Sequence, residues 1–294
     1  MARKLWVFQA VSEAFKAWPR QIAGAWGALG LLSLSVGALL LSACLGVYTA
    51  YAAPVLGFVT AVLTLVAYGA LTRSALSPNL RDARQMGLGF AGLQFGGAEL
   101  QILFSGLLTG LFAALVIGMF ALVLVLIASL LVMAPDDVLG LFRAPEAQVM
   151  GLMQAAEAQD LEALQTSGAD WRVLVLFVLA AFLGFHTLRI LTKLKLGPVA
   201  SVARGRIVSL NALSLGHHSA LPLLFGAVLV SIVPLLLLVG VFQPLLWGAL
   251  TPLLSVLPLG VAKLQSITAL GILIWGLLPL CVGYLSAAYH HLES

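Results

Sequence analysis

The chain has 294 residues, of which 62% are hydrophobic and only 9% are charged. Soluble domains carry about 25% charged residues, so this composition excludes an ordinary soluble domain. The formal net charge is +4, but the basic residues gather at the ends of apolar segments and form no basic soluble domain, which argues against nucleic-acid binding. The residues therefore predict a single all-α, polytopic membrane domain over 1–294.

The first predicted element is an amphipathic helix over residues 5–18. Its apolar residues recur at spacings of three and four: Leu5, Phe8, Val11, Phe15 and Trp18. This period is typical of a helix with one apolar face, and Pro19 is expected to end it or to turn it into the first span. Such a helix lies along a membrane surface or packs on the protein's own helix ends, and the pattern favours neither.

Six segments are long and apolar enough to cross a bilayer, because about 20 apolar residues span its hydrocarbon core. They are predicted as helices, since a spanning backbone must satisfy its own hydrogen bonds. The six segments are 22–47, 52–72, 99–133, 172–192, 220–241 and 266–289. They form three predicted hairpins, over 22–72, 99–192 and 220–289. The third span is long for a bilayer and must tilt or project beyond it.

An internal repeat organises the chain. Residues 71–97 align without a gap onto residues 191–217, an offset of 120, with matches such as Arg73/Lys193 and Arg84/Arg204. In both copies a span ends in a basic patch, passes a proline and leads through a half-polar segment into the next span. These half-polar segments, 78–98 and 197–218, are predicted to be amphipathic and interfacial. We therefore expect three units, each an interfacial helix followed by a hairpin.

The basic residues predict the orientation of the protein. With six spans, most of them lie on one side together with both termini, and the positive-inside rule makes that side cytoplasmic. The expected location is a bacterial inner membrane. On that side, basic side chains favour anionic lipid headgroups by about 1 kcal/mol each. The predicted headgroup contacts are Lys4, Lys16, Arg20, Arg81, Arg84, Lys193, Lys195, Arg204 and Arg206.

The segment over 134–170 is predicted to be external and acidic. It holds seven carboxylates and one arginine, and Pro145 and Glu146 suit the start of a helix. We expect this helix to cover the protein's own span ends, to dock another protein or to be mobile. The residues predicted for docking are Glu157, Asp160 and Glu162.

No pattern of residues indicates an enzyme. The chain has no Gly-x-Ser-x-Gly elbow, no His-Glu-x-x-His pair and no phosphate-binding loop. Glu99, at the head of the third span, is expected to serve the helix N-terminus. The five histidines, His186, His217, His218, His290 and His291, are expected to be interfacial polar residues rather than metal ligands, because neighbours such as His217 and His218 point about 100° apart on a helix. No cofactor is predicted.

The stretch Leu194 to Ile207, with Asn211 to Gly216 after it, resembles the membrane domain of some glycerophosphoryl diester phosphodiesterases and the YciC-like inner-membrane proteins. The closing Ala288 to Leu292 is also similar to their C-terminal Tyr-x-x-Leu. The likeness is good over roughly 188–224 and extends to the rest only in layout. This chain has Ala212 where those families have Trp, and it has no phosphodiesterase catalytic domain. The resemblance therefore implies a fold and no diesterase activity.

Two functions remain open from the sequence. The first is a non-catalytic membrane protein that acts as an accessory or scaffold subunit, or organises lipid around partners, with membrane lipids, another membrane protein or a second copy as its partners. The second is a transporter or flippase for a lipid or amphiphile, which the repeats and the prolines near the fifth span favour. A transporter needs a polar-lined cavity among spans three to six, whereas a scaffold should have a closed, apolar interior.

Overall fold

The computed structural model describes residues 6–44, 52–132, 171–208, 212–215, 219–237 and 268–293. Every regular element in these ranges is helical, and six helices are long and apolar enough to span a membrane. The prediction of an all-helical, six-span membrane fold is thereby confirmed. The chain divides into two compact units: the first joins residues 1–109 to 192–294, and the second is 110–191.

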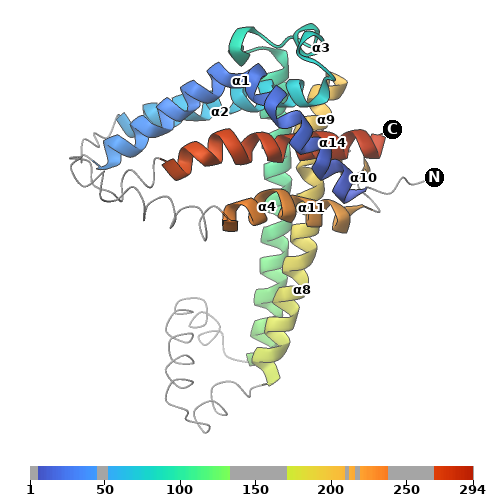
Figure 1. The fold of residues 1–294 in the computed structure, drawn as a ribbon. Helices are drawn as coiled ribbons and strands as arrows, with labels where there is room; N and C mark the ends of the chain where they lie inside the picture. Colours follow the sequence, from blue (N-terminus) through green and yellow to red (C-terminus); the bar gives the residue numbers. More distant parts are fainter. Residues whose placement is uncertain are drawn as a thin grey trace. The chain divides into compact units, whose positions relative to one another are not determined.

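The first unit is built around three long helices, α1 (Val7–Cys44), α2 (Ala52–Leu76) and α14 (Leu278–Glu293) (Figure 1). They pack closely because their contact faces are rich in small residues: Ala10 and Ala14 of α1 lie in one buried cluster with α14, and Ala25 and Ala28 lie in a second cluster with α2. Short side chains let helix backbones approach, which is the usual way to join helices inside a bilayer.

Residues 5–18 were predicted as an amphipathic helix that Pro19 either ends or turns into the first span. From Val7 onward they belong to α1, which continues through Pro19 without a break. The buried face of this first part is made of alanines, whereas Phe8 and Phe15 of the predicted apolar stripe point outward. The N-terminal part of α1 therefore packs on the protein through its small residues and presents its large apolar residues to the surroundings.

The two copies of the repeat have the same order of elements. After α2 come α3 (Leu80–Gln85), the short 3-10 helix η1 (Phe90–Gly92) and α4 (Gly97–Val132). After α8 (Trp171–Leu194) come α9 (Leu196–Arg204), α10 (Ala212–Leu215) and α11 (Ala220–Leu237). At 36 residues, α4 is about 54 Å long against a hydrocarbon core of about 30 Å, so it must tilt or project.

The sixth span contains a π-helical segment, η3 (Leu273–Leu277). A π-helix shifts the backbone hydrogen bonds by one residue and frees a carbonyl for another partner. Trp18 of α1 donates to the backbone oxygen of Trp275 at 3.2 Å, and the Trp275 indole donates to Ser33 Oγ at 2.9 Å. These two hydrogen bonds hold the sixth span along α1.

The second unit holds the rest of α4 and most of α8. These helices bury little: within their most apolar stretches, 11% of the α4 residues and 6% of the α8 residues are buried, compared with 39% for α1. Most of their apolar surface is therefore left for lipid or for other membrane helices.

Candidate membrane-interface site

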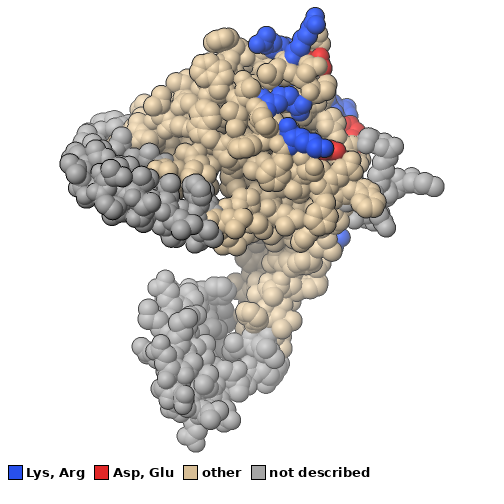
Figure 2. All heavy atoms as spheres, viewed as in Figure 1, with Lys and Arg blue, Asp and Glu red and all other residues tan. Residues whose placement is uncertain are grey.

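The basic residues predicted to contact lipid headgroups lie mostly in the first unit, around α3, the start of α1 and α9. Figure 2 shows the visible Lys and Arg side chains mainly toward one side of this unit, beside a broad surface of uncharged residues. The exposed members of the set are Lys16, Arg81, Arg84, Lys195 and Arg206. These five side chains come from three segments of the first unit, and we call them together the basic surface below.

The position of α3 explains why Arg81 and Arg84 belong to the basic surface. Asn79 caps the helix by accepting the Asp82 N–H at 2.8 Å, and Ala83 is buried against α1 and α2. A six-residue helix fixed at its start and along one face leaves its other side chains outside. Arg81 and Arg84 are consequently presented to the surroundings together.

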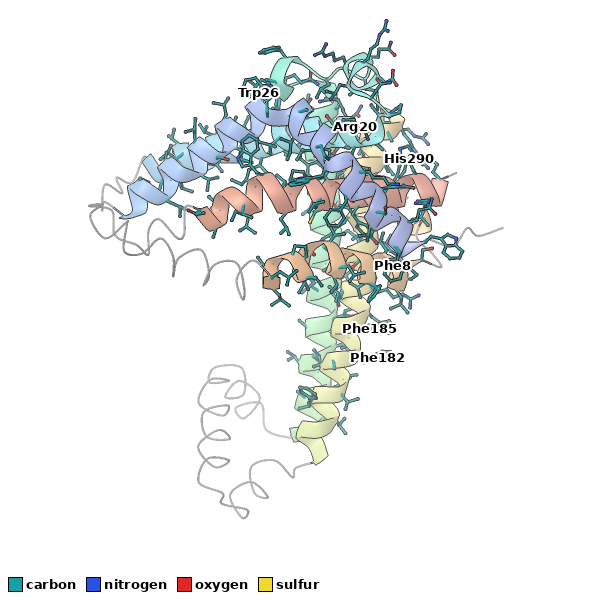
Figure 3. The ribbon with its side chains drawn as sticks, viewed as in Figure 1. Phe8, Arg20, Trp26, Phe182, Phe185 and His290 are labelled. Carbon is teal, nitrogen blue, oxygen red and sulfur yellow. The ribbon has the colours of Figure 1, made fainter. Side chains whose placement is uncertain are left out.

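Arg20 has a different role from the exposed residues. Its Nε donates to the Ser74 oxygen at 2.9 Å, and its terminal nitrogens donate to the oxygens of Pro78 at 2.6 Å and Ala75 at 3.5 Å. The last carbonyls of a helix have no partner within the helix, so Arg20 of α1 satisfies the end of α2 (Figure 3). Its predicted lipid contact stays a prediction, but its guanidinium is already engaged in the fold.

Arg204 is also engaged. Its Nε lies 3.2 Å from the Tyr289 hydroxyl and 3.0 Å from Glu293 Oε1, both in the last turns of α14. Lys193 is half-buried and exposed less than Lys195. The repeat partner Arg84 is exposed, so the two copies of the repeat use matching arginines differently: one is tied to α14 and the other faces outward.

A buried ion pair joins α2 to α4. Arg73 Nη1 lies 2.7 Å from Glu99 Oε1, and the two side chains are 4% and 0% exposed. Glu99 Oε2 also accepts the Gly96 N–H at 2.9 Å, as expected for a carboxylate in the first turn of a helix. Arg73 Nε finds no hydrogen-bonding partner among the described residues. The helix-terminal role of Glu99 was predicted from the sequence, whereas its pairing with Arg73 was not.

Two of the three histidines within the described ranges lie near a polar partner, and the third, His290, is exposed. His186 Nδ1 lies 3.1 Å from the Phe182 oxygen of its own helix, and His291 Nε2 lies 3.2 Å from Glu13 Oε2. In the part of the chain that the structure describes, no group of three or more His, Cys, Asp or Glu side chains could hold a metal ion. His217 and His218 lie outside the described residues, as do Lys4 and the predicted docking residues Glu157, Asp160 and Glu162.

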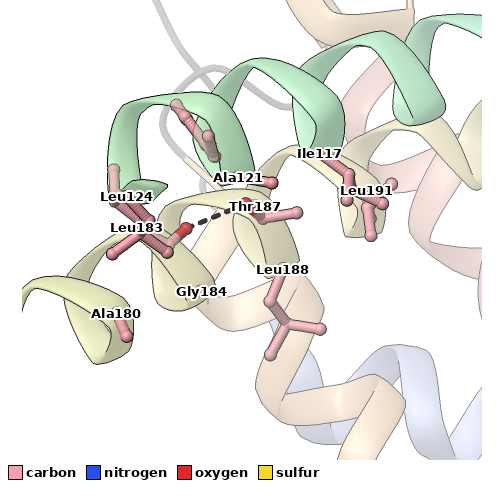
Figure 4. Close-up of a pocket in the computed structure, with 10 residues that line it drawn as sticks. Ile117, Ala121, Leu124, Ala180, Leu183, Gly184, Thr187, Leu188 and Leu191 are labelled. Carbon is pink, nitrogen blue, oxygen red and sulfur yellow. Dashed lines mark hydrogen bonds between the residues drawn. The ribbon is translucent and has the colours of Figure 1, made fainter. Parts of the chain in front are cut away.

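An apolar groove of about 400 Å³ lies between α4 and α8 within the second unit (Figure 4). Small residues create the hollow, among them Ala121, Ala180 and Gly184. Thr187 carries the one hydroxyl in its lining, and that hydroxyl donates to the Leu183 oxygen at 2.8 Å. The groove therefore offers hydrocarbon contacts and no free polar group for orienting a hydrophilic molecule.

Comparison with protein-family models, with curated proteins and with solved structures finds no match to this chain. The resemblance to the phosphodiesterase membrane domain and the YciC-like proteins consequently stays a prediction, and the function has to be argued from the chain's own residues.

Proposed function

We propose that this protein is a non-catalytic inner-membrane protein that organises anionic lipid around itself and around a partner, as an accessory or scaffold subunit. The observation that carries the proposal is the basic surface, the five exposed basic side chains that come from three segments of the first unit, in a molecule whose visible Lys and Arg side chains lie mainly on one side (Figure 2). We place that surface and both termini on the cytoplasmic side of a bacterial inner membrane, following the positive-inside rule.

Charge supports lipid as the ligand of the basic surface. The two α3 arginines, Arg81 and Arg84, are exposed, and each basic residue near an anionic leaflet contributes about 1 kcal/mol. Removing both arginines should weaken the binding free energy for anionic lipid next to α3 by about 2 kcal/mol, which corresponds to roughly a thirty-fold drop in the preference for anionic lipid there. Among the described residues, the buried charges Arg73 and Glu99 are paired with each other, which suits a structural joint better than an ion pathway.

Extraction in native lipid followed by mass spectrometry of lipids and proteins tests this function. The wild type should retain anionic lipid above the bulk membrane level, and the Arg81→Gln/Arg84→Gln variant should retain less. Arg204→Gln is the matched control, because this arginine is already bound to Tyr289 and Glu293 and its loss should change the bound lipid little. Equal lipid profiles in all three proteins would refute the proposal.

The same extraction tests the partner. A scaffold subunit should come out with another membrane protein in stoichiometric amount, and neutralising the predicted external docking residues Asp160 and Glu162 should weaken that recovery. Recovery unchanged by neutralisation would remove the docking role from these residues.

Lipid transport is the second candidate function from the sequence, but the groove between α4 and α8 does not favour it. The groove is large enough for part of an acyl chain, yet its lining is apolar, whereas a transporter needs a polar-lined cavity. A scramblase assay with fluorescent lipid in reconstituted vesicles separates the two functions, since a scaffold should leave the lipid asymmetry intact.

A further inference from the structure

The turn between α3 and α4, residues 86–95, is fixed by close backbone packing. Ala91 and Gly92 both have left-handed backbone angles, with φ of 55° and 74°. A Cβ added to Gly92 would lie 2.9 Å from Ala25 Cα and 2.9 Å from Ala70 Cβ, so the backbone of the turn is wedged directly between α1 and α2. A non-glycine residue in the left-handed region costs energy and is kept only where packing determines it.

This fixed turn holds most of its large apolar side chains outward, although Leu88 is buried. Phe90 is 85% exposed and Phe95 is 55% exposed, and Met86 and Leu93 are exposed as well. Trp26 of α1, labelled in Figure 3, adds an exposed indole whose ring meets the Phe90 ring edge-on at 6.3 Å between centroids. We call residues 86–95 the aromatic turn. Its backbone packs against α1 and α2, while its aromatic rings point away from the protein.

Both ends of the aromatic turn indicate what covers the rings. At its C-terminal end it leads into α4, a membrane span that begins at Gly97, so the rings stand at the head of a span. At its N-terminal end it follows α3, which exposes Arg81 and Arg84. Aromatic side chains beside cationic ones match the boundary between acyl chains and anionic headgroups, where rings favour the interface and cations favour phosphate.

The second copy of the repeat differs from the first at a matched arginine. Arg204 is bound to α14 through Tyr289 and Glu293, whereas its repeat partner Arg84 is exposed. Val208 and its repeat partner Leu88 are both buried, so the backbone of both copies packs on the protein at this position.

We propose that the aromatic turn is a lipid-inserting element: its rings, led by Phe90, enter the headgroup–acyl boundary of an anionic leaflet while Arg81 and Arg84 bind the phosphates above them. This inference rests on the proposed function, because it names the element through which the basic surface meets lipid.

A single-cysteine experiment tests the insertion. Cys44 and Cys281 are the only cysteines of the chain, so Cys44→Ala/Cys281→Ala provides the background for Phe90→Cys labelled with an environment-sensitive NBD dye. The matched control is Gln85→Cys, an exposed position of α3 five residues earlier in the chain. Because Phe90 is 85% exposed, its replacement should leave the fold intact, which size-exclusion and thermal melting of each labelled protein will check.

The full-length protein is reconstituted at low protein content into vesicles of phosphatidylcholine with phosphatidylglycerol. The label at position 90 should emit at shorter wavelength than the label at 85, resist an aqueous quencher, and be quenched more by a nitroxide near the lipid headgroup than by one at the chain end. Equal aqueous quenching at both positions would overturn the proposal. Shielding at 90 that vanishes on further dilution with lipid would also overturn it, because it would assign the rings to contact with a second copy.

The outcomes separate this inference from the proposed function. A water-exposed label at position 90, together with loss of anionic lipid in Arg81→Gln/Arg84→Gln, would reject the insertion and keep the lipid-organising function. A shielded label together with lipid profiles unchanged by the arginine substitutions would keep the insertion and reject that function.

Discussion

Removing the carboxylate of Glu99 should destabilise the protein by about 3–5 kcal/mol, because it leaves the Arg73 guanidinium buried without a counter-charge. Arg73 is 4% exposed and has no second acidic neighbour within the described residues. On the scaling of soluble domains, this loss corresponds to a melting temperature lower by roughly 6–20 °C. The assay is thermal melting of Glu99→Ala in native-lipid discs, followed by size-exclusion chromatography.

Two further variants show whether the orphaned charge is the cause. Arg73→Met/Glu99→Met should recover most of the loss, because replacing a whole buried ion pair by apolar residues is often neutral or stabilising. Glu293→Ala removes the partner of Arg204 from a pair that is 41% and 26% exposed, so it should cost about 1 kcal/mol or less. The reasoning is refuted if Glu99→Ala melts like Glu293→Ala, or if the double variant is no more stable than Glu99→Ala alone.

Two other substitutions carry predictions for the same melting assay. Gly92→Ala should lower the stability of the fold by more than the roughly 1–2 kcal/mol of a left-handed non-glycine residue, because its Cβ would also meet backbone and side-chain atoms at 2.9 Å. Gly87→Ala, with φ of 85° and open space around it, should lose only that backbone contribution. Equal losses of stability in the two variants would contradict this. Arg20→Lys should lose about 1–3 kcal/mol, because an ammonium group cannot reproduce the planar fork that reaches three carbonyls, and Lys16→Gln, at an exposed position, should melt like the wild type.

The layout of the fold could be predicted because it follows from composition and repeat. Apolar length determines that a segment spans, and the match of residues 71–97 to 191–217 predicts that the connections between spans share one design. The structure has the corresponding order of elements in both copies. The packing of the N-terminal segment was harder to predict, because its buried face is made of Ala10, Ala14 and Ala17. Alanines give a weak hydrophobic pattern beside the large side chains of Phe8 and Phe15.

The roles of individual charges could not be predicted in the same way. A basic residue beside a span is predicted to contact a lipid headgroup. The sequence does not distinguish Arg84, which is exposed, from Arg20, which caps the end of another helix. The difference depends on which helix end lies within reach of the guanidinium. Likewise, Arg73 and Glu99 pair across two helices, and only their juxtaposition in space reveals it. The carbonyls left free at the end of α2 were the one available hint for Arg20.

The pair of hydrogen bonds that joins α1 to η3 has a consequence for biogenesis. Trp18 and its acceptor at residue 275 are 257 positions apart in the chain, and ribosomes add about 5–20 residues per second, so roughly 13–50 s separate the synthesis of the two partners. During that interval the Trp18 indole and the small-residue face of α1 lie in the membrane without α14. The insertion machinery must therefore shelter the first helix until the last one arrives, and this nascent stage is the point at which assembly is most exposed to failure.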